Sequence, residues 1–111
     1  MSAHVEGVGR FKRRLREAEA AIEAGYEEGK RAVAAEVAEE WRRDAPVDTG
    51  AFKRSIRSDA DSAFTDIDYA PFVEFGTSTR PARPVGRAAA ARVERKVGGI
   101  VAKAIRRRLP R

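Results

Sequence analysis

The hydrophobic pattern of the first part of the chain predicts one long amphipathic helix over residues 10–44. Apolar side chains recur there at spacings of three, four and seven, the period of one helix face; they are Phe11, Leu15, Ala18, Ile22, Tyr26, Val33, Val37 and Trp41. Pro46 ends the helix, because the residue before a proline is pushed out of the helical region. Residues 1–9 show no such period, so we expect a flexible start.

Two glycines interrupt this helix. Gly25 and Gly29 follow Ala21 at intervals of four, which makes a ridge of small residues, and each glycine costs about 1 kcal/mol relative to alanine. The ridge indicates either the close approach of a second helix or a hinge. We favour one unbroken helix, with a break between Gly25 and Gly29 as the alternative.

The predicted helix is too long for its own chain to cover. At about 1.5 Å per residue it spans about 50 Å, whereas a compact domain of this size has a radius of gyration of about 13 Å. Another copy of the chain is the simplest partner for the apolar face, and a solvent-exposed coiled-coil arm is the alternative. The expected inter-subunit contacts on this helix are Phe11, Ile22, Gly25, Tyr26 and Gly29.

Residues 45–84 predict a small module of β-strands and loops. Residues 47–50 form a turn in which Asp48 or Thr49 bonds the backbone ahead and Gly50 takes a positive φ. Alternation over residues 52–58 and 63–68, separated by the turn at residues 59–62, predicts a hairpin. Its expected core residues are Phe52, Ile56, Phe64 and Ile67.

The second half of this module holds most of the aromatic side chains. Residues 69–76 (YAPFVEFG) predict one or two helical turns that begin near Tyr69 and Pro71 and end at Gly76 as a left-handed cap. Phe72 and Phe75 are expected to pack on the hairpin, with Glu74 on the opposite side. Residues 77–84 are expected to be extended and to form a contact surface, with a plain linker as the alternative; the residues that define this surface are Arg80, Pro81, Arg83 and Pro84.

Residues 85–109 predict a second amphipathic helix, kinked near Gly98 and Gly99, that packs on the hairpin or on the first helix. Its apolar stripe consists of Ala88, Ala89, Val93, Val97, Ile100, Val101, Ala104 and Ile105. The chain of 111 residues is therefore expected to be a single α+β domain with a long N-terminal helix, a small antiparallel hairpin, a short helical turn and a C-terminal helix.

Charge is distributed unevenly along the chain. The net charge of +6 comes from residues 80–111, which hold eleven basic residues and one acidic residue, whereas residues 44–79 hold three basic and seven acidic residues. The basic end is suited to phosphates or to the acidic surface of a neighbouring subunit, and a disordered basic tail is the alternative for residues 106–111. With no cysteine and no long apolar run, we expect no disulfide, no thiolate metal site and no membrane span, in a protein made in the cytoplasm.

The sequence offers little catalytic chemistry. Asp48-Thr49-Gly50 followed by Ala51 matches the active-site turn of aspartic proteases, but that mechanism needs paired carboxylates from β-rich subunits, and here the triplet follows a helix and Pro46. Asp48 is better explained as a turn residue. The phosphate-loop, dinucleotide and zinc-protease motifs are missing, and His4 has no partners at ligand spacing. We therefore expect no enzyme, no cofactor and no metal.

Three segments of the chain together resemble a known family. They are residues 45–51 (APVDTGA), 69–77 (YAPFVEFGT) and 80–84 (RPARP), with a basic strand ending near Ser55 and Ile56 after the first. In this order and spacing they resemble the neck or tail-completion family of long-tailed bacteriophages, whose members are minor tail or head–tail joining components. The likeness covers about 40 central residues, and the flanking helices match only in kind and place. The chain departs from the family at residues 85–87 (VGR), where the family usually carries bulkier apolar residues and often another proline.

The resemblance implies a structural, non-enzymatic virion protein that forms a homo-oligomeric ring of six or more copies at the head–tail junction. Its partners would be the head connector or adaptor, the tail terminator or tail-tube protein, and DNA that passes through the lumen without sequence-specific binding. The family motif falls on residues that we assign to shape and docking: Pro46, Asp48, Thr49, Gly50, Tyr69, Pro71, Glu74, Phe75, Gly76, Pro81, Arg83 and Pro84. To the turn and core we add Phe72, and to the inter-subunit contacts Glu74 and Arg80. The rival hypothesis is a nucleic-acid-binding module that uses the arginine-rich last third.

Overall fold

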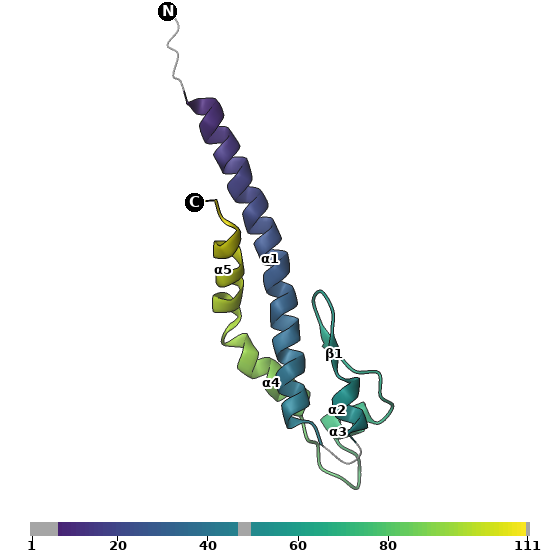
Figure 1. Cartoon of the computed structure of the whole chain (residues 1–111). Helices are drawn as coiled ribbons and strands as arrows, with labels where there is room; N and C mark the ends of the chain where they lie inside the picture. The colour runs from purple at the N-terminus through teal and green to yellow at the C-terminus, as the bar shows by residue number, and fades with distance from the viewer. Residues whose placement is uncertain (1–6, 47–49, 111) are drawn as a thin grey trace, which may run out of the picture.

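The computed structural model of the chain describes residues 7–46 and 50–110. Figure 1 shows a long helix flanked on one side by two helices and on the other by a small module. The predicted α+β class is confirmed. The elements in chain order are α1 (Val8–Asp44), α2 (Ala51–Ser55), β1 (Arg57–Ser58), β2 (Ala63–Phe64), α3 (Ala70–Phe75), α4 (Val85–Glu94) and α5 (Val97–Arg108).

Helix α1 is continuous over 37 residues, so the alternative of a break between Gly25 and Gly29 is wrong. The last third of the chain folds back along it, with α4 beside its C-terminal part and α5 beside its middle (Figure 1). Of the two partners predicted for the second apolar stripe, the hairpin and the first helix, the structure shows the first helix. The Cα radius of gyration is 21.4 Å, well above the value of about 13 Å for a compact chain of this length.

The second helix is broken earlier than predicted. α4 ends at Glu94 and α5 begins at Val97, and between them the Lys96 backbone N–H donates a 2.8 Å hydrogen bond to the carbonyl of Val93. Gly98 and Gly99 lie inside the first turn of α5 with open space around them. The kink therefore falls at Arg95 and Lys96, and the two glycines do not cause it.

A small core joins the C-terminal end of α1 to the module. It consists of Ala38, Ala45, Phe52, Ile56 and Ala70, with Trp41, Ala63, Ile67 and Val73 packed against it. The ring of Phe52 meets Trp41 edge-on at 6.3 Å and lies 5.7 Å from Tyr69. The core roles of Phe52, Ile56 and Ile67 are confirmed, whereas Phe64 is 38% exposed and does not belong to this core.

Residues 51–55 form a helix where the alternating pattern predicted a strand. Phe52 and Ile56 are both buried, and they lie four residues apart, the spacing of one helix face as well as of a strand face. Gly50 takes the predicted positive φ, 80°, and its carbonyl accepts a 3.0 Å bond from the Arg54 N–H. The strand is therefore reduced to Arg57 and Ser58.

The predicted hairpin turn is confirmed. Arg57 pairs with Phe64 and Ser58 with Ala63 in an antiparallel ladder. Between the strands, the carboxylate of Asp59 accepts bonds from the backbone N–H groups of Asp61 (3.1 Å) and Ser62 (2.9 Å). These bonds hold the pKa of Asp59 below its usual range, because they stabilise the ionised carboxylate. The turn therefore presents a negative charge at the hairpin tip.

Helix α3 begins at the predicted place, with Pro71 in its first turn. The expectation that Phe72 and Phe75 pack on the hairpin is wrong: they are 60% and 67% exposed, because Ala70 and Val73 face the core from this short helix. Gly76 has the predicted positive φ of 79°, but its ψ of 175° is extended, so the cap is not left-handed helical.

The segment after α3 is only partly extended, contrary to the prediction. Thr77 and Arg80 close a turn through a 2.9 Å backbone bond from the Thr77 N–H to the Arg80 carbonyl. The chain then returns to α3, where the Arg83 N–H donates a 2.7 Å bond to the carbonyl of Val73. Arg80, Pro81, Arg83 and Pro84 are exposed, as a contact surface requires.

Candidate assembly surface

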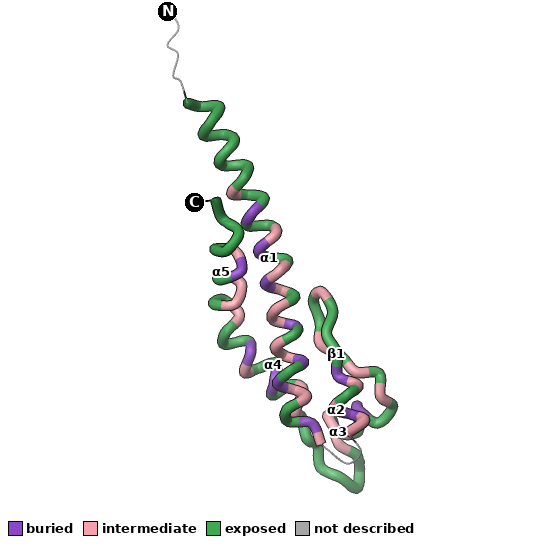
Figure 2. Tube along the Cα trace, in the orientation of Figure 1, coloured by how far each residue is buried: buried purple, intermediate pink, exposed green. Residues whose placement is uncertain are grey.

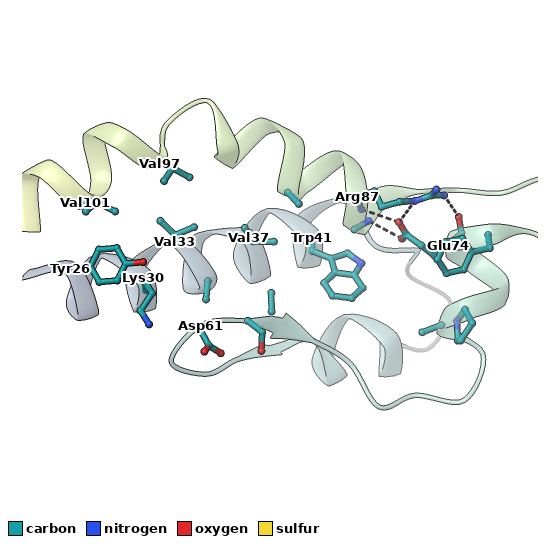
Figure 3. Close-up of a pocket in the computed structure, with 18 residues that line it drawn as sticks. Tyr26, Lys30, Val33, Val37, Trp41, Asp61, Glu74, Arg87, Val97 and Val101 are labelled. Atoms are coloured by element: carbon teal, nitrogen blue, oxygen red, sulfur yellow. Dashed lines mark hydrogen bonds and ion pairs between the residues drawn. The ribbon is translucent and has the colours of Figure 1, made fainter. Parts of the chain in front are cut away.

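An open groove runs along α1 between its two neighbours. The hairpin and α3 form one wall and α4 and α5 form the other, while the valines and the tryptophan of α1 form the floor (Figure 3). Its volume is about 670 Å³. The lining residues are Tyr26, Lys30, Val33, Ala34, Val37, Trp41, Asp61, Ser62, Ala63, Ala70, Pro71, Glu74, Phe75, Gly86, Arg87, Ala90, Val97 and Val101. Most of these side chains are apolar, so the groove is suited to an apolar partner.

The floor of the groove continues into an uncovered stripe on α1. Helical spacing places Val33 and Val37 on the face that carries Tyr26, Ile22, Leu15 and Phe11 further toward the N-terminus. Phe11 is 65% exposed and Leu15 is 49% exposed. Figure 2 shows that the first turns of α1 are exposed all round, while burial begins where α5 meets the helix. We call residues 8–20 the arm; its apolar residues lack cover within the described chain.

Two glycines of α1 let α5 approach it closely. A Cβ atom on Gly25 would lie 2.5 Å from the Cα of Ile105, and one on Gly29 would lie 2.9 Å from the Cα of Val101. Both distances are shorter than any side chain tolerates, so glycine is required at each position. The expectation that Gly25 and Gly29 contact another subunit is therefore wrong, because α5 of the same chain already occupies that face. Ile22 and Tyr26, in contrast, remain about half exposed.

Glu74 links α3 to the start of α4 by hydrogen bonds. Its carboxylate accepts bonds from the backbone N–H groups of Gly86 (3.0 Å) and Arg87 (2.9 Å), which are among the unsatisfied donors of the first helical turn. The Arg87 guanidinium donates to the same carboxylate at 3.0 Å and to the Glu74 carbonyl at 2.7 Å (Figure 3). Glu74 therefore acts as a helix cap from a distant segment. The bonds of this carboxylate are made within the chain, and the role of Glu74 as an inter-subunit contact stays a prediction.

Gly86 allows the hydrogen-bonded contact between Glu74 and the start of α4 to lie against Trp41. A Cβ atom at Gly86 would lie 3.0 Å from the indole ring of Trp41 and 3.1 Å from the carboxylate of Glu74. The indole Nε1 of Trp41 is buried without a hydrogen-bond partner within the described chain. Sequence reasoning missed Gly86 and Arg87, although the departure from the family pattern falls at these residues. The small residue there makes room for the indole ring of Trp41.

Ion pairs join α1 to α4 and to the bend that follows it, along the side away from the hairpin. Arg92 donates a 2.8 Å bond to Glu40 and also pairs with Asp44, and Lys96 pairs with Glu36 at 2.8 Å. The bond from Arg92 holds the pKa of Glu40 below its usual range, and the bond to Glu36 raises the pKa of Lys96. These contacts neutralise part of the basic last third within the chain.

A second set of ion pairs joins the end of α5 to α1. Arg107 and Arg108 both reach the carboxylate of Glu28, at 3.2 and 2.8 Å. The bond from Arg108 holds the pKa of Glu28 below its usual range. Residues 106–108 are therefore helical and partly paired, and the alternative of a disordered tail is wrong for them. Lys103 and Arg106, with Gly99 and Arg107, line a shallow hollow on the outer side of α5.

The motif residues of the module meet around a second hollow, at the end of the molecule away from the arm. Its volume is about 380 Å³, and Pro46, Gly50, Phe52, Tyr69, Phe72, Val73, Thr77, Arg80, Pro81 and Arg83 line it. Residues from all three resembling segments are thus brought together. The predicted turn residues Asp48 and Thr49 lie outside the described residues.

Apolar residues make up most of the lining of both hollows. Within the described residues, no group of three or more His, Cys, Asp or Glu side chains is placed to hold a metal ion. Across the same residues, none of the helices combines the length and apolar character needed to cross a bilayer. Comparison with protein-family models, curated proteins and solved structures finds no match to the chain.

Proposed function

We propose that this chain is a structural virion protein of the head–tail junction of a long-tailed bacteriophage. Copies of it would form a ring of six or more subunits between the head connector and the tail tube, around the channel that DNA crosses. The observation that carries the proposal is the arm: the first turns of a long helix expose Phe11 and Leu15 with no cover from the described chain. Apolar surface of this kind on a small protein is typical of an assembly interface.

The elongated shape supports an assembly role. The Cα positions extend much further in one direction than in the other two, with extents of 84 × 22 × 19 Å. A small chain of this shape buries little of its own surface, and its core is confined to one end. Contacts between copies would supply the missing burial, as they do in obligate oligomers.

The clustering of the three motif segments supports the likeness to the neck or tail-completion family. Pro46, Tyr69 and Pro81 come from three separate segments and line one hollow at the end of the molecule. Arg80, Arg83 and the exposed Phe72 all line this hollow, and arginine and aromatic residues are enriched in protein interfaces. We propose that this end docks the head connector or the tail terminator.

Mass measurement tests the proposal. The purified chain, alone and mixed with candidate connector or tail-tube proteins, is examined by size-exclusion chromatography with light scattering. We expect a closed oligomer, formed either alone or on the connector. Alone, its mass is a fixed multiple of the 12.2 kDa of one chain, and on the connector it adds such a multiple to the mass of the connector. A chain that keeps the mass of a single copy, alone and with every partner, contradicts the proposal.

A nucleic-acid-binding module is the second candidate, favoured by the basic surface of α5. Lys103, Arg106 and Arg107 line a hollow on its outer side, and the last third of the chain carries most of the net charge. Binding to phosphates would weaken linearly on a log–log plot against salt, with a slope set by the number of contacts. Tight binding of duplex DNA at physiological salt by a monomeric chain favours this candidate over the ring.

A further inference from the structure

We propose that the arm of one copy, residues 8–20, seats in the groove between α1 and the hairpin of a second copy. The inference rests on the proposed function only in taking the partner to be a second copy. The two surfaces that meet are the exposed apolar stripe of the arm and the groove lined by Val33, Val37 and Trp41.

The arm has the pattern of a helix that lies in an apolar groove. Val8, Phe11 and Leu15 recur at intervals of three and four on one face, and all three side chains are about half exposed or more. The arm is already helical in the structure, so it loses little conformational entropy when it binds in a groove. The same chain thus has an apolar groove and an apolar helix face that its own described residues leave uncovered.

Charge complements shape at the two surfaces. Residues 8–16 carry five basic residues and no acidic residue; the basic residues are Arg10, Lys12, Arg13, Arg14 and Arg16. The hairpin wall of the groove, residues 57–68, carries four aspartates against Arg57 alone. Of these aspartates, Asp61 lines the groove and is exposed at the hairpin tip (Figure 3). The groove also holds two basic side chains, and both are paired with glutamates of the same chain: Lys30 with Glu27 at 3.3 Å and Arg87 with Glu74 at 3.0 Å. Opposite charges of this kind orient a partner and exclude the reversed arrangement.

The arm cannot reach the groove of its own chain. Both surfaces belong to the same unbroken helix, and Leu15 lies 22 residues from Val37 along it, which corresponds to about 33 Å. Folding the arm back would require a break in α1, and the structure has none between Val8 and Asp44. An arm that seats in such a groove must therefore come from another copy. Because the two surfaces of one chain differ, each copy offers one arm and one groove, and such contacts form rings when the rotation closes.

Site-directed crosslinking tests the contact, because the chain has no cysteine of its own. One set of full-length variants carries Val8→Cys, Phe11→Cys or Leu15→Cys on the arm. A second variant carries Ser62→Cys in the groove, and its matched control carries Ser78→Cys in the exposed loop outside the groove. Each arm variant is mixed with each partner variant and oxidised, and covalent dimers are counted after electrophoresis. A disulfide forms only where the Cα atoms approach within about 7 Å.

We expect at least one arm position to crosslink to Ser62→Cys at least ten times more than to Ser78→Cys. We also expect Phe11→Asp combined with Leu15→Asp to weaken self-association at least tenfold while leaving the far-ultraviolet spectrum unchanged, since both positions are exposed. Equal or absent crosslinking in a chain that still forms oligomers overturns the seating of the arm but leaves the ring proposal standing. A chain that is monomeric alone and with its partners overturns both.

Discussion

At Gly25, the backbones of α1 and α5 are closer than any other residue would allow. The substitution Gly25→Ala places a methyl group 2.5 Å from the Cα of Ile105, a backbone atom that cannot rotate away. We expect the free energy of unfolding to fall by about 1–3 kcal/mol, as in other overpacked contacts. Chemical denaturation followed by circular dichroism measures the change.

The matched control is Gly99→Ala in the first turn of α5. A Cβ atom there has nothing within 4 Å, so the substitution removes only the backbone freedom of glycine. We expect it to stabilise the chain by about 0.5–1 kcal/mol. If Gly25→Ala proves as stable as Gly99→Ala, α5 does not pack against α1 as described.

Glu74 is the residue on which the start of α4 depends. Replacing it with alanine leaves the N–H groups of Gly86 and Arg87 without their acceptor and removes the partner of the Arg87 guanidinium. We expect Glu74→Ala to lower the free energy of unfolding by about 1–3 kcal/mol. Its side chain is only 13% exposed, so water replaces these bonds poorly.

The control for Glu74 is Glu94→Ala, at the exposed C-terminal end of the same helix. Surface substitutions of this kind change stability by less than about 0.5 kcal/mol. Thermal melts of the two variants separate the cap from the general effect of removing a glutamate. Equal melting temperatures for both variants would show that the hydrogen bonds of Glu74 between α3 and α4 do not stabilise the fold.

At the scale of whole elements, the ion pairs between α1 and the last two helices predict a pH dependence. The pKa values of Glu28 and Glu40 lie below the usual value of a glutamate in the folded chain, because arginine side chains bond the ionised carboxylates. The unfolded chain then binds protons more readily, so their contribution to stability is fully present above the unfolded pKa and is lost as the pH falls through the folded values. Thermal melts from neutral pH into the acid range measure this loss.

The combined variant Glu28→Gln and Glu40→Gln tests the assignment. Glutamine does not titrate in this range, so the contribution of the two glutamates to the acid-induced loss of stability should disappear. The melting temperature of the variant should therefore vary less with pH than that of the wild-type chain. Part of the slope is expected to remain, because the pKa of Asp59 in the hairpin turn is also lowered. An acid profile identical to that of the wild type would show that these two pairs do not hold α5 and α4 on α1.

The helices could be predicted from the sequence far better than the short elements. The stripe of α1 repeats over many turns, so its period is unambiguous, and Pro46 fixes where it stops. The segment from Phe52 to Ile56 is too short to separate a helix from a strand, since both place residues four apart on one face. Gly98 and Gly99 predict a kink in the last helix, but the chain bends two residues earlier, where the Lys96 N–H bonds to the carbonyl of Val93.

The candidate site could be predicted only in part. The exposure of Phe11, Ile22 and Tyr26 follows from a helix that outgrows its domain, and the sequence indicates it. Whether the small residues at Gly25 and Gly29 face a second subunit or the same chain depends on how the last helix folds back, which no local pattern reveals. The same holds for Glu74, whose bonds to Gly86 and Arg87 join segments 12 and 13 residues apart.

At the scale of the whole molecule, the two ends differ in charge and in packing. One end is a basic, exposed helical arm, and the other holds the core, the acidic hairpin and the hollow lined by the motif residues. The groove lies between them, with Trp41, the chain's only tryptophan, at its floor. We therefore expect the emission of Trp41 to change with protein concentration as arms seat in grooves, and to stay constant in the Phe11→Asp and Leu15→Asp variant.

The central claim is that other copies of the chain cover the arm. Sedimentation equilibrium over a range of concentrations, with and without the connector, measures the mass of the wild-type chain and of the Phe11→Asp and Leu15→Asp variant side by side. We predict that the wild-type chain sediments with a mass that is a multiple of 12.2 kDa, or adds such a multiple to the mass of the connector, and that the variant sediments as a single chain. A wild-type chain that sediments as a single copy under every condition would contradict the claim.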